Sequence, residues 1–82
     1  MLSLDRLKIN DRAIIKSINC DKLVKIRLLD MGFNTDEEIK CVLVSPSKYI
    51  KAYLIKNTLI AIRNSDTKKI MVEVLDEDSS NR

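Results

Sequence analysis

The residues that could hold a metal ion are few and scattered. Cys20 and Cys41 lie far apart in the sequence, and the chain has no histidine. A tetrahedral metal site needs several such ligands at close spacing. In the acidic run 36–38 only Asp36 and Glu38 could converge, because neighbouring side chains on a strand point to opposite faces. We therefore expect no metal site and no cofactor, with the cysteines packed as small apolar residues.

Catalytic residues are just as poorly supported. Histidine, the commonest general base, is absent, and Ser45 and Ser47 belong to no nucleophile motif. A single glycine cannot form a glycine-rich loop around a phosphate. We expect a protein that is not an enzyme.

The element with the clearest start and stop signals is a predicted helix over Asp21–Met31. Asp21 is expected to cap it by accepting hydrogen bonds from the free amides of the first turn. Gly32, the only glycine, follows where the backbone must turn left-handed. The apolar residues between these signals predict a broad, buried face: Leu23, Val24, Ile26, Leu28, Leu29 and Met31. Arg27 and Asp30 share a helix face, so a weak ion pair between them is one expectation; the alternatives are that Arg27 fixes the neighbouring loop or contacts a partner.

Five segments are predicted to be short β-strands because apolar residues alternate along them or β-branched residues dominate. They are Arg12–Asn19, Glu37–Ser45, Ile50–Lys56, Thr58–Arg63 and Lys69–Leu75. The alternation points these residues inward: Ala13, Ile15, Ile18, Ile39, Cys41, Leu43, Ile70, Val72 and Val74. Pro46 ends the second strand, and Asn57 joins the third and fourth in a tight hairpin.

The remaining segments are connections. Leu4–Asn10 is expected to pack on the sheet through Leu4, Leu7 and Ile9, and residues 64–67 to form a turn or one helical turn. Residues 1–75 are then one domain, and 76–82 an acidic tail without apolar residues that we expect to be disordered.

The predicted architecture is mainly β, with five strands and one helix inserted between the first and second. So small a sheet protects its edges best by curling into a barrel, and an SH3-like barrel satisfies this pattern. The net charge of +3 is too small to be good evidence for nucleic-acid binding, and aromatic residues make up only 4% of the chain, so we expect no nucleic-acid partner. No apolar run is long enough to cross a membrane and no signal peptide is evident, so we expect a cytoplasmic protein without direct membrane insertion.

The chain resembles the ferrous iron transport protein A (FeoA) family of small SH3-like domains. The resemblance runs from about Leu4 to Val74 and is strongest in the RLLDMGF sequence at 27–33. The segments 45–46, 60–63 and 70–72 match the family's proline, "IALR" and final-strand signatures. The family has glycines where Asn10, Asp36 and Asn57 stand here. Asn and Asp tolerate left-handed turns best among the other residues, so we expect the turns to persist.

A fourth departure lies in a loop. Lys48-Tyr49-Ile50 replaces the family's Gly-Asp-Pro turn, so the shape of this loop is expected to differ. On the adjoining strand the resemblance implies that Tyr53 and Ile55 point inward, which leaves Ile50, Ala52 and Leu54 as an apolar row on the outside. We expect this row either to be covered, by the helix or by the segment Leu4–Asn10 (the lead-in segment), or to bind a partner. The predicted partner surface comprises Lys48, Tyr49, Ile50, Ala52, Leu54 and Arg63.

The resemblance implies an accessory protein of ferrous iron transport. It would contact the cytoplasmic portion of a membrane ferrous iron permease, and a homo-oligomer is a further alternative. Two other functions stay open. One is a stand-alone regulatory module of an iron-dependent transcriptional regulator; the other is a small-barrel nucleic-acid binder, which would stack bases on exposed aromatic residues.

Overall fold

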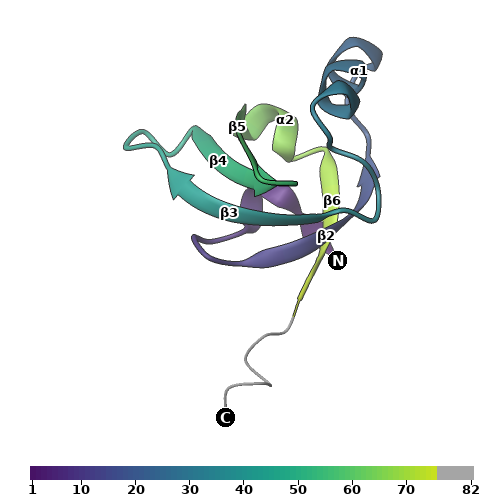
Figure 1. Ribbon diagram of the computed structural model, residues 1–82. Helices are drawn as coiled ribbons and strands as arrows, with labels where there is room; N and C mark the ends of the chain where they lie inside the picture. Colours follow the sequence, from purple (N-terminus) through teal and green to yellow (C-terminus); the bar gives the residue numbers. More distant parts are fainter. Residues whose placement is uncertain (76–82) are drawn as a thin grey trace.

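The computed structural model describes residues 1–75 (Figure 1). Its strands are β1 (Leu2–Ser3), β2 (Arg12–Ile18), β3 (Glu38–Val44), β4 (Ile50–Ile55), β5 (Thr58–Arg63) and β6 (Ile70–Val74). A 3-10 turn η1 (Leu4–Arg6) and two helices, α1 (Lys22–Asp30) and α2 (Asn64–Thr67), connect them. The predicted tail Asp76–Arg82 lies outside the described residues. None of the helices in 1–75 is long and apolar enough to cross a membrane.

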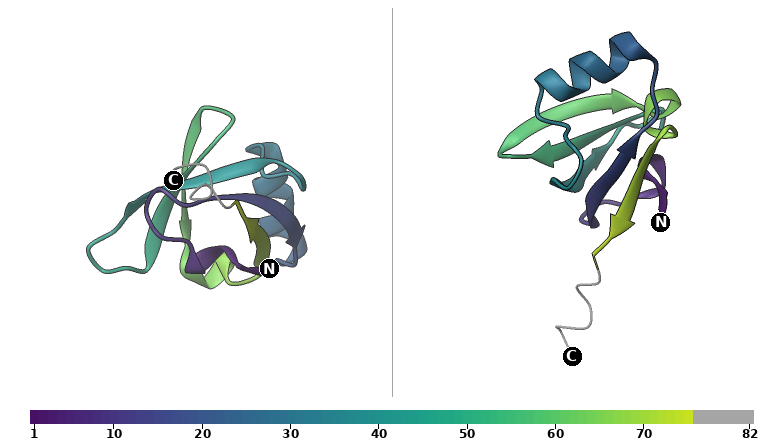
Figure 2. Two further views of the ribbon diagram at one scale, coloured as in Figure 1. Left: turned by 90° about the horizontal axis from the view of Figure 1, so that it is seen from below. Right: turned by 90° about the vertical axis from the view of Figure 1, so that its right-hand side faces the viewer.

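All strands belong to one antiparallel sheet in the order β1-β6-β2-β3-β4-β5. The strands curl round into a ring, as the left view of Figure 2 shows, and the buried apolar side chains form one core cluster. The mainly β prediction with a helix between the first two long strands is therefore confirmed. The short β1, which pairs with β6, is a sixth strand that the sequence pattern did not reveal.

Two β-bulges decide which residues face the core. The register of β2 against β6 shifts between Ile15 and Ser17, which keeps both Ile15 and Ile18 inside, as predicted. In β3 a second shift follows Cys41. Because of it Leu43 turns outward and is 57% exposed, so its predicted inward orientation is wrong. Val44 packs against the core instead.

Two further predicted core residues are also exposed. Ile9 is 50% exposed in the loop after η1, and Val74 is 39% exposed at the last position of β6. Both residues lie at the ends of their segments. The alternation of apolar residues continues there in the sequence, but the core does not extend to these positions.

The left-handed turns occur where they were predicted. Asn10, Asp36 and Asn57 have φ angles of 77°, 71° and 65°. Lys56 also has a positive φ, so Lys56 and Asn57 form the two-residue loop of a β4–β5 hairpin with the type I′ requirement met at both positions. Lys48 adopts a φ of 68°, so the loop that lost its glycine keeps a left-handed residue.

The end of α1 is a Schellman motif. Gly32 has a φ of 101° and donates its N–H to the Leu29 carbonyl at 3.0 Å. Phe33 donates to the Leu28 carbonyl at 2.9 Å, and both Phe33 and Leu28 are buried. This is the hydrogen-bond pair and the apolar contact that such a helix end requires. Gly32 is therefore the helix terminator that the sequence predicted.

The rest of the predicted helix differs from the structure. Asp21 occupies the N-cap position, but its side chain makes no capping hydrogen bond. Of the apolar residues predicted to be buried only Leu28 is, because successive residues lie 100° apart around a helix and these six do not share one side. Ile26 and Leu29 point away from Leu28 and are 45% and 40% exposed. Val24 is half-buried and packs against the core, so within residues 1–75 α1 contacts the core through Val24 and Leu28 while its other apolar residues are exposed.

Lys51 fastens the lead-in segment to the sheet. Its Nζ donates to the Asp5 carbonyl at 2.6 Å and to the Leu7 carbonyl at 2.9 Å. Leu4 and Leu7 on the same segment are fully buried, as predicted. One ammonium group therefore satisfies two carbonyls of a segment whose side chains close the core.

We expect Lys51→Met to lower the free energy of unfolding by about 2 kcal/mol, because two charge-assisted hydrogen bonds are lost while the aliphatic packing is kept. Urea unfolding followed by circular dichroism measures this change. Lys68→Met, at an exposed lysine after α2, is the control and should change the stability little. Equal stability of both variants would show that the two bonds contribute nothing.

Tyr53 places a hydroxyl in the core. The side chain is fully buried, and its oxygen has no hydrogen-bond partner among the described residues. Burial raises the pKa of the Tyr53 phenol well above its usual range, and the nearby Cys41 adds to the increase. The folded protein therefore strongly favours the neutral phenol.

Tyr53→Phe should be neutral or raise the free energy of unfolding by up to about 1 kcal/mol, because it removes an unpaired buried hydroxyl. In the wild type the raised pKa means that stability is complete below about pH 10 and falls as the pH rises further, since only the unfolded chain ionises Tyr53 readily. Unfolding curves between pH 8 and 11.5 should show a smaller alkaline loss in the variant. Destabilisation at pH 7 would contradict the prediction.

Candidate partner-binding surface

The outer face of β4 carries the predicted apolar row. Ile50 is 40% and Leu54 37% exposed, while Ala52 between them is half-buried. Tyr53 and Ile55 point inward and are fully buried, as the sequence predicted. The lead-in does not cover the row, because it is held on the opposite face of β4 by Lys51.

The row continues onto both neighbouring strands. Ala52 pairs with Ala61 and Leu54 with Leu59 on β5, while the outward-turned Leu43 of β3 lies opposite Ala52. Residues paired across antiparallel strands point to the same face of the sheet. Leu43 and Leu59 are each 57% exposed. The result is an apolar surface that spans three strands, and we call Leu43, Ile50, Ala52, Leu54, Leu59 and Ala61 the outer patch.

The Lys48–Tyr49 loop lies at one end of the outer patch and is held in place. Asn64 donates its side-chain amide to the Lys48 carbonyl and its backbone N–H to the Tyr49 carbonyl, both at 2.8 Å. Tyr49 is 73% exposed. Arg63 pairs with Ile50 in the strand register, so it borders the same end of the patch. Of the six predicted partner residues, Ile50, Ala52, Leu54 and Arg63 therefore share one face of the β4–β5 hairpin, and Lys48 and Tyr49 lie in the loop that adjoins one end of it.

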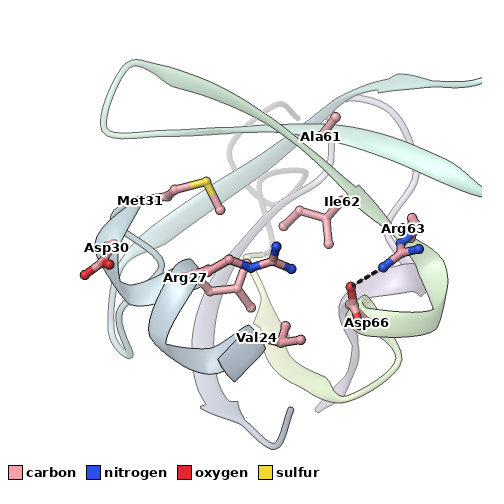
Figure 3. Close-up of a pocket in the computed structure, with 9 residues that line it drawn as sticks. Val24, Arg27, Asp30, Met31, Ala61, Ile62, Arg63 and Asp66 are labelled. Carbon is pink, nitrogen blue, oxygen red and sulfur yellow. Dashed lines mark ion pairs between the residues drawn. The ribbon is translucent and has the colours of Figure 1, made fainter. Parts of the chain in front are cut away.

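A groove separates β5 from α1 (Figure 3). It has a volume of about 460 Å³. From α1 and its C-terminal end come Val24, Arg27, Leu28, Asp30 and Met31; from β5 and α2 come Ala61, Ile62, Arg63 and Asp66. Figure 2 (right) shows α1 as a separate layer above the β4–β5 hairpin, which explains why a hollow lies between them.

The charged residues of the groove are arranged unequally. The Arg27 guanidinium points into the groove and the Asp30 carboxylate points away from it (Figure 3). The predicted Arg27–Asp30 ion pair is absent among the ion pairs of residues 1–75, because the two side chains diverge. Arg63 has Asp66 as its partner, at 3.9 Å. Arg27 is thus a cation that faces the groove without a carboxylate beside it in the described part of the chain.

The residues considered for metal binding are engaged elsewhere. Glu38 pairs with Arg12 at 2.6 Å, and Asp36 faces Lys16 at 3.9 Å. Cys41 is fully buried, and burial raises the pKa of its thiol. Within residues 1–75 no three cysteine or acidic side chains lie together in a way that could hold a metal ion.

Sequence reasoning missed most of the groove. It singled out Arg27 and Arg63 but assigned them to separate roles, and it assigned Val24 and Met31 to a buried helix face. The residue pattern of α1 cannot predict that the helix lies beside β5, because β5 is some thirty residues further along the chain. The one available signal was the spread of apolar residues around the whole helix, which a single buried face does not need.

Comparisons with known proteins agree with the fold. The family model described as "FeoA domain" matches residues 2–74. The FeoA protein from Chlorobium tepidum superposes with a TM-score of 0.87 at 26% identity, covering 90% of this chain and 70% of that one. The iron(II) transport protein A from Clostridium thermocellum gives 0.85 at 32% identity, over 90% of this chain and 46% of that one. This chain therefore spans about half the length of the latter protein.

Two further likenesses show the fold alone. The Stenotrophomonas maltophilia FeoA, solved with zinc and described as a prokaryotic SH3 domain protein, has a TM-score of 0.78 at 23% identity, over 89% of this chain and 91% of that one. A manganese-dependent transcriptional repressor gives 0.82 at 13% identity, over 90% of this chain and 36% of that one. No curated protein sequence matches.

The outer patch predicts a sharp difference between neighbouring residues. Leu54→Asp should leave the protein folded, with a loss of about 1 kcal/mol, because Leu54 is part-exposed and pairs with Lys40, which can face the new carboxylate. Ile55→Asp should abolish folding, since Ile55 is 1% exposed. Circular dichroism and amide NMR spectra of the two variants measure this difference. Unfolding of Leu54→Asp would show that the patch is part of the core.

Proposed function

Since the chain belongs to the FeoA domain family, which is linked to ferrous iron transport, we propose that it is an accessory protein of that process. It acts by protein–protein contact with the cytoplasmic portion of a membrane ferrous iron permease. The observation that carries this proposal is the outer patch, an uncovered apolar surface that continues over three neighbouring strands. Apolar surface of this extent on a small protein is typical of an interaction site.

The surroundings of the outer patch support contact with an acidic protein. Lys48 and Arg63 border one end. Lys40 and Lys56 lie at the other, next to Leu54, where Glu38 lines the same hollow and Glu37 pairs with Lys56 at 3.2 Å. Interfaces combine an apolar centre with a polar rim, and a rim in which cations outnumber anions favours an acidic partner. The protein in this proposal is cytoplasmic, carries out no catalysis and holds no resident metal.

A regulatory module remains the second candidate, because the fold also matches the domain of a manganese-dependent repressor. That likeness is at 13% identity and concerns the fold only, whereas the family model covers nearly the whole described chain. Nucleic-acid binding has less support. Phe33 and Tyr53 are fully buried, which leaves Tyr49 as the exposed aromatic residue for base stacking.

Co-purification from iron-limited cells tests the proposed function. We expect the tagged wild-type protein to retain the ferrous iron permease. The amount of permease recovered with Leu54→Asp should be at least about tenfold lower, because burying a charge in the interface weakens binding by more than about 1.4 kcal/mol. The matched control is Ile9→Asp, which also replaces an exposed aliphatic residue with aspartate but lies outside the patch. This variant should retain the permease.

Other results have defined meanings. Retention of a DNA-binding repressor in place of the permease would favour the regulatory module. A second copy of the chain as the sole partner, shown by sedimentation, would assign the outer patch to self-association. Equal recovery of the permease with Leu54→Asp would exclude the patch as the contact.

A further inference from the structure

The free edge of β5 lies beside the α1 groove. Among the strands of residues 1–75, β5 ends the order of the sheet and pairs with β4 alone. The Asn64 N–H donates to the Tyr49 carbonyl, so Ile62 and Ile60, at every second position before it, turn their backbone groups toward β4. In an antiparallel ladder the intervening residues turn theirs the other way. The N–H and C=O groups of Leu59 and Ala61 and the N–H of Arg63 therefore face the open edge.

The N–H and C=O groups of Leu59 and Ala61 and the N–H of Arg63 have no backbone partner in the described chain, whereas the Arg63 carbonyl caps α2 and accepts the first hydrogen bond of that helix. The backbone hydrogen bonds outside the ladder include none from Leu59, Ala61 or Arg63. An unpaired strand edge is a ready template for another strand unless it is protected by charge, proline or a bulge. β5 has no proline and no bulge, and it pairs with β4 in unbroken register over all six residues. It is a regular edge with groups available for pairing.

The groove supplies the side-chain recognition that such an edge needs. Val24, Met31 and Ala61 give it apolar walls. Arg27 points its guanidinium into the space, with Asp30 directed away and Asp66 occupied by Arg63 (Figure 3). A guanidinium in a partly apolar hollow binds a carboxylate better than other groups, since it can donate two parallel hydrogen bonds.

We propose that this groove binds an extended segment of an acidic protein, which adds as a strand to the free edge of β5 and places a carboxylate against Arg27. Strand addition gives affinity through main-chain hydrogen bonds, and alternate side chains give specificity. The segment needs an acidic residue beside aliphatic ones, to meet Arg27 and the apolar walls together. The inference deepens the proposed function by assigning the chemistry of the partner segment, and in that respect it rests on it.

A synthetic peptide tests this inference without the permease. The probe is an eight-residue peptide that alternates valine with glutamate, titrated into nitrogen-15-labelled protein. We expect shifts at residues of α1 and β5 and slower amide exchange at Leu59, Ala61 and Arg63, since these amides become hydrogen-bonded. A peptide with glutamine in place of glutamate should bind at least about tenfold more weakly, because it cannot pair with Arg27.

Two matched comparisons separate the contributions. Arg27→Gln should weaken the glutamate peptide about tenfold, whereas Lys25→Gln, the same loss of charge at an exposed position of α1 that does not line the groove, should not. A glutamate peptide with N-methyl groups on alternate amides keeps its side chains but cannot pair with a strand along its methylated edge. When its methylated edge faces β5, this peptide should not slow amide exchange at Leu59, Ala61 and Arg63.

The outcomes distinguish this inference from the proposed function. No peptide shifts at α1 or β5 at 1 mM, or equal binding by peptides methylated on either edge, would overturn strand addition. The same variants are then assayed with the permease. Full recovery of the permease by Arg27→Gln would overturn the groove as the site and leave the function standing. Peptide binding without any permease recovery by the wild type would overturn the function and leave the groove.

Discussion

The rest of the structure depends on how far one antiparallel sheet curls. A sheet of six short strands can enclose a core of aliphatic side chains only if it bends strongly, and bulges in β2 and β3 allow this. The lead-in then closes the core with Leu4 and Leu7, held by the ammonium of Lys51. The bulge in β3 also turns Leu43 to the outside. Closure of the core and exposure of the outer patch therefore have a common origin.

The curl also leaves β5 as an open edge. In the order β1-β6-β2-β3-β4-β5 no described strand pairs with β5 on its outer side. The helix α1 comes near this edge but contacts the core through Leu28 and Val24, so a groove remains between the helix and β5. This small domain thus leaves apolar surface uncovered on two adjoining faces, the outer patch and the groove. The two faces share Ala61.

Sequence reasoning succeeded wherever the cause was local. Asn10, Asp36 and Asn57 were identified as left-handed turns because few side chains tolerate that backbone conformation. Gly32 was identified as a helix terminator for the same reason, and the Schellman hydrogen bonds confirm it. Hairpin spacing identified the turn between β4 and β5, while the inward direction of Tyr53 and Ile55 came from the resemblance to the FeoA family. The turns and the helix end follow from the conformational limits of one or two residues.

The sequence by itself therefore determined the mainly β barrel, the turns and the outer row of β4. Only the tertiary structure decided the direction of Leu43, the exposure of α1 and the meeting of Arg27 with the edge of β5. A bulge shifts alternation by one residue without a distinctive residue type, so Leu43 could not be placed from its neighbours. The groove lies between α1 and β5, which are some thirty residues apart in the sequence. Their distance in space depends on how the sheet curls, so no local sequence pattern predicts it.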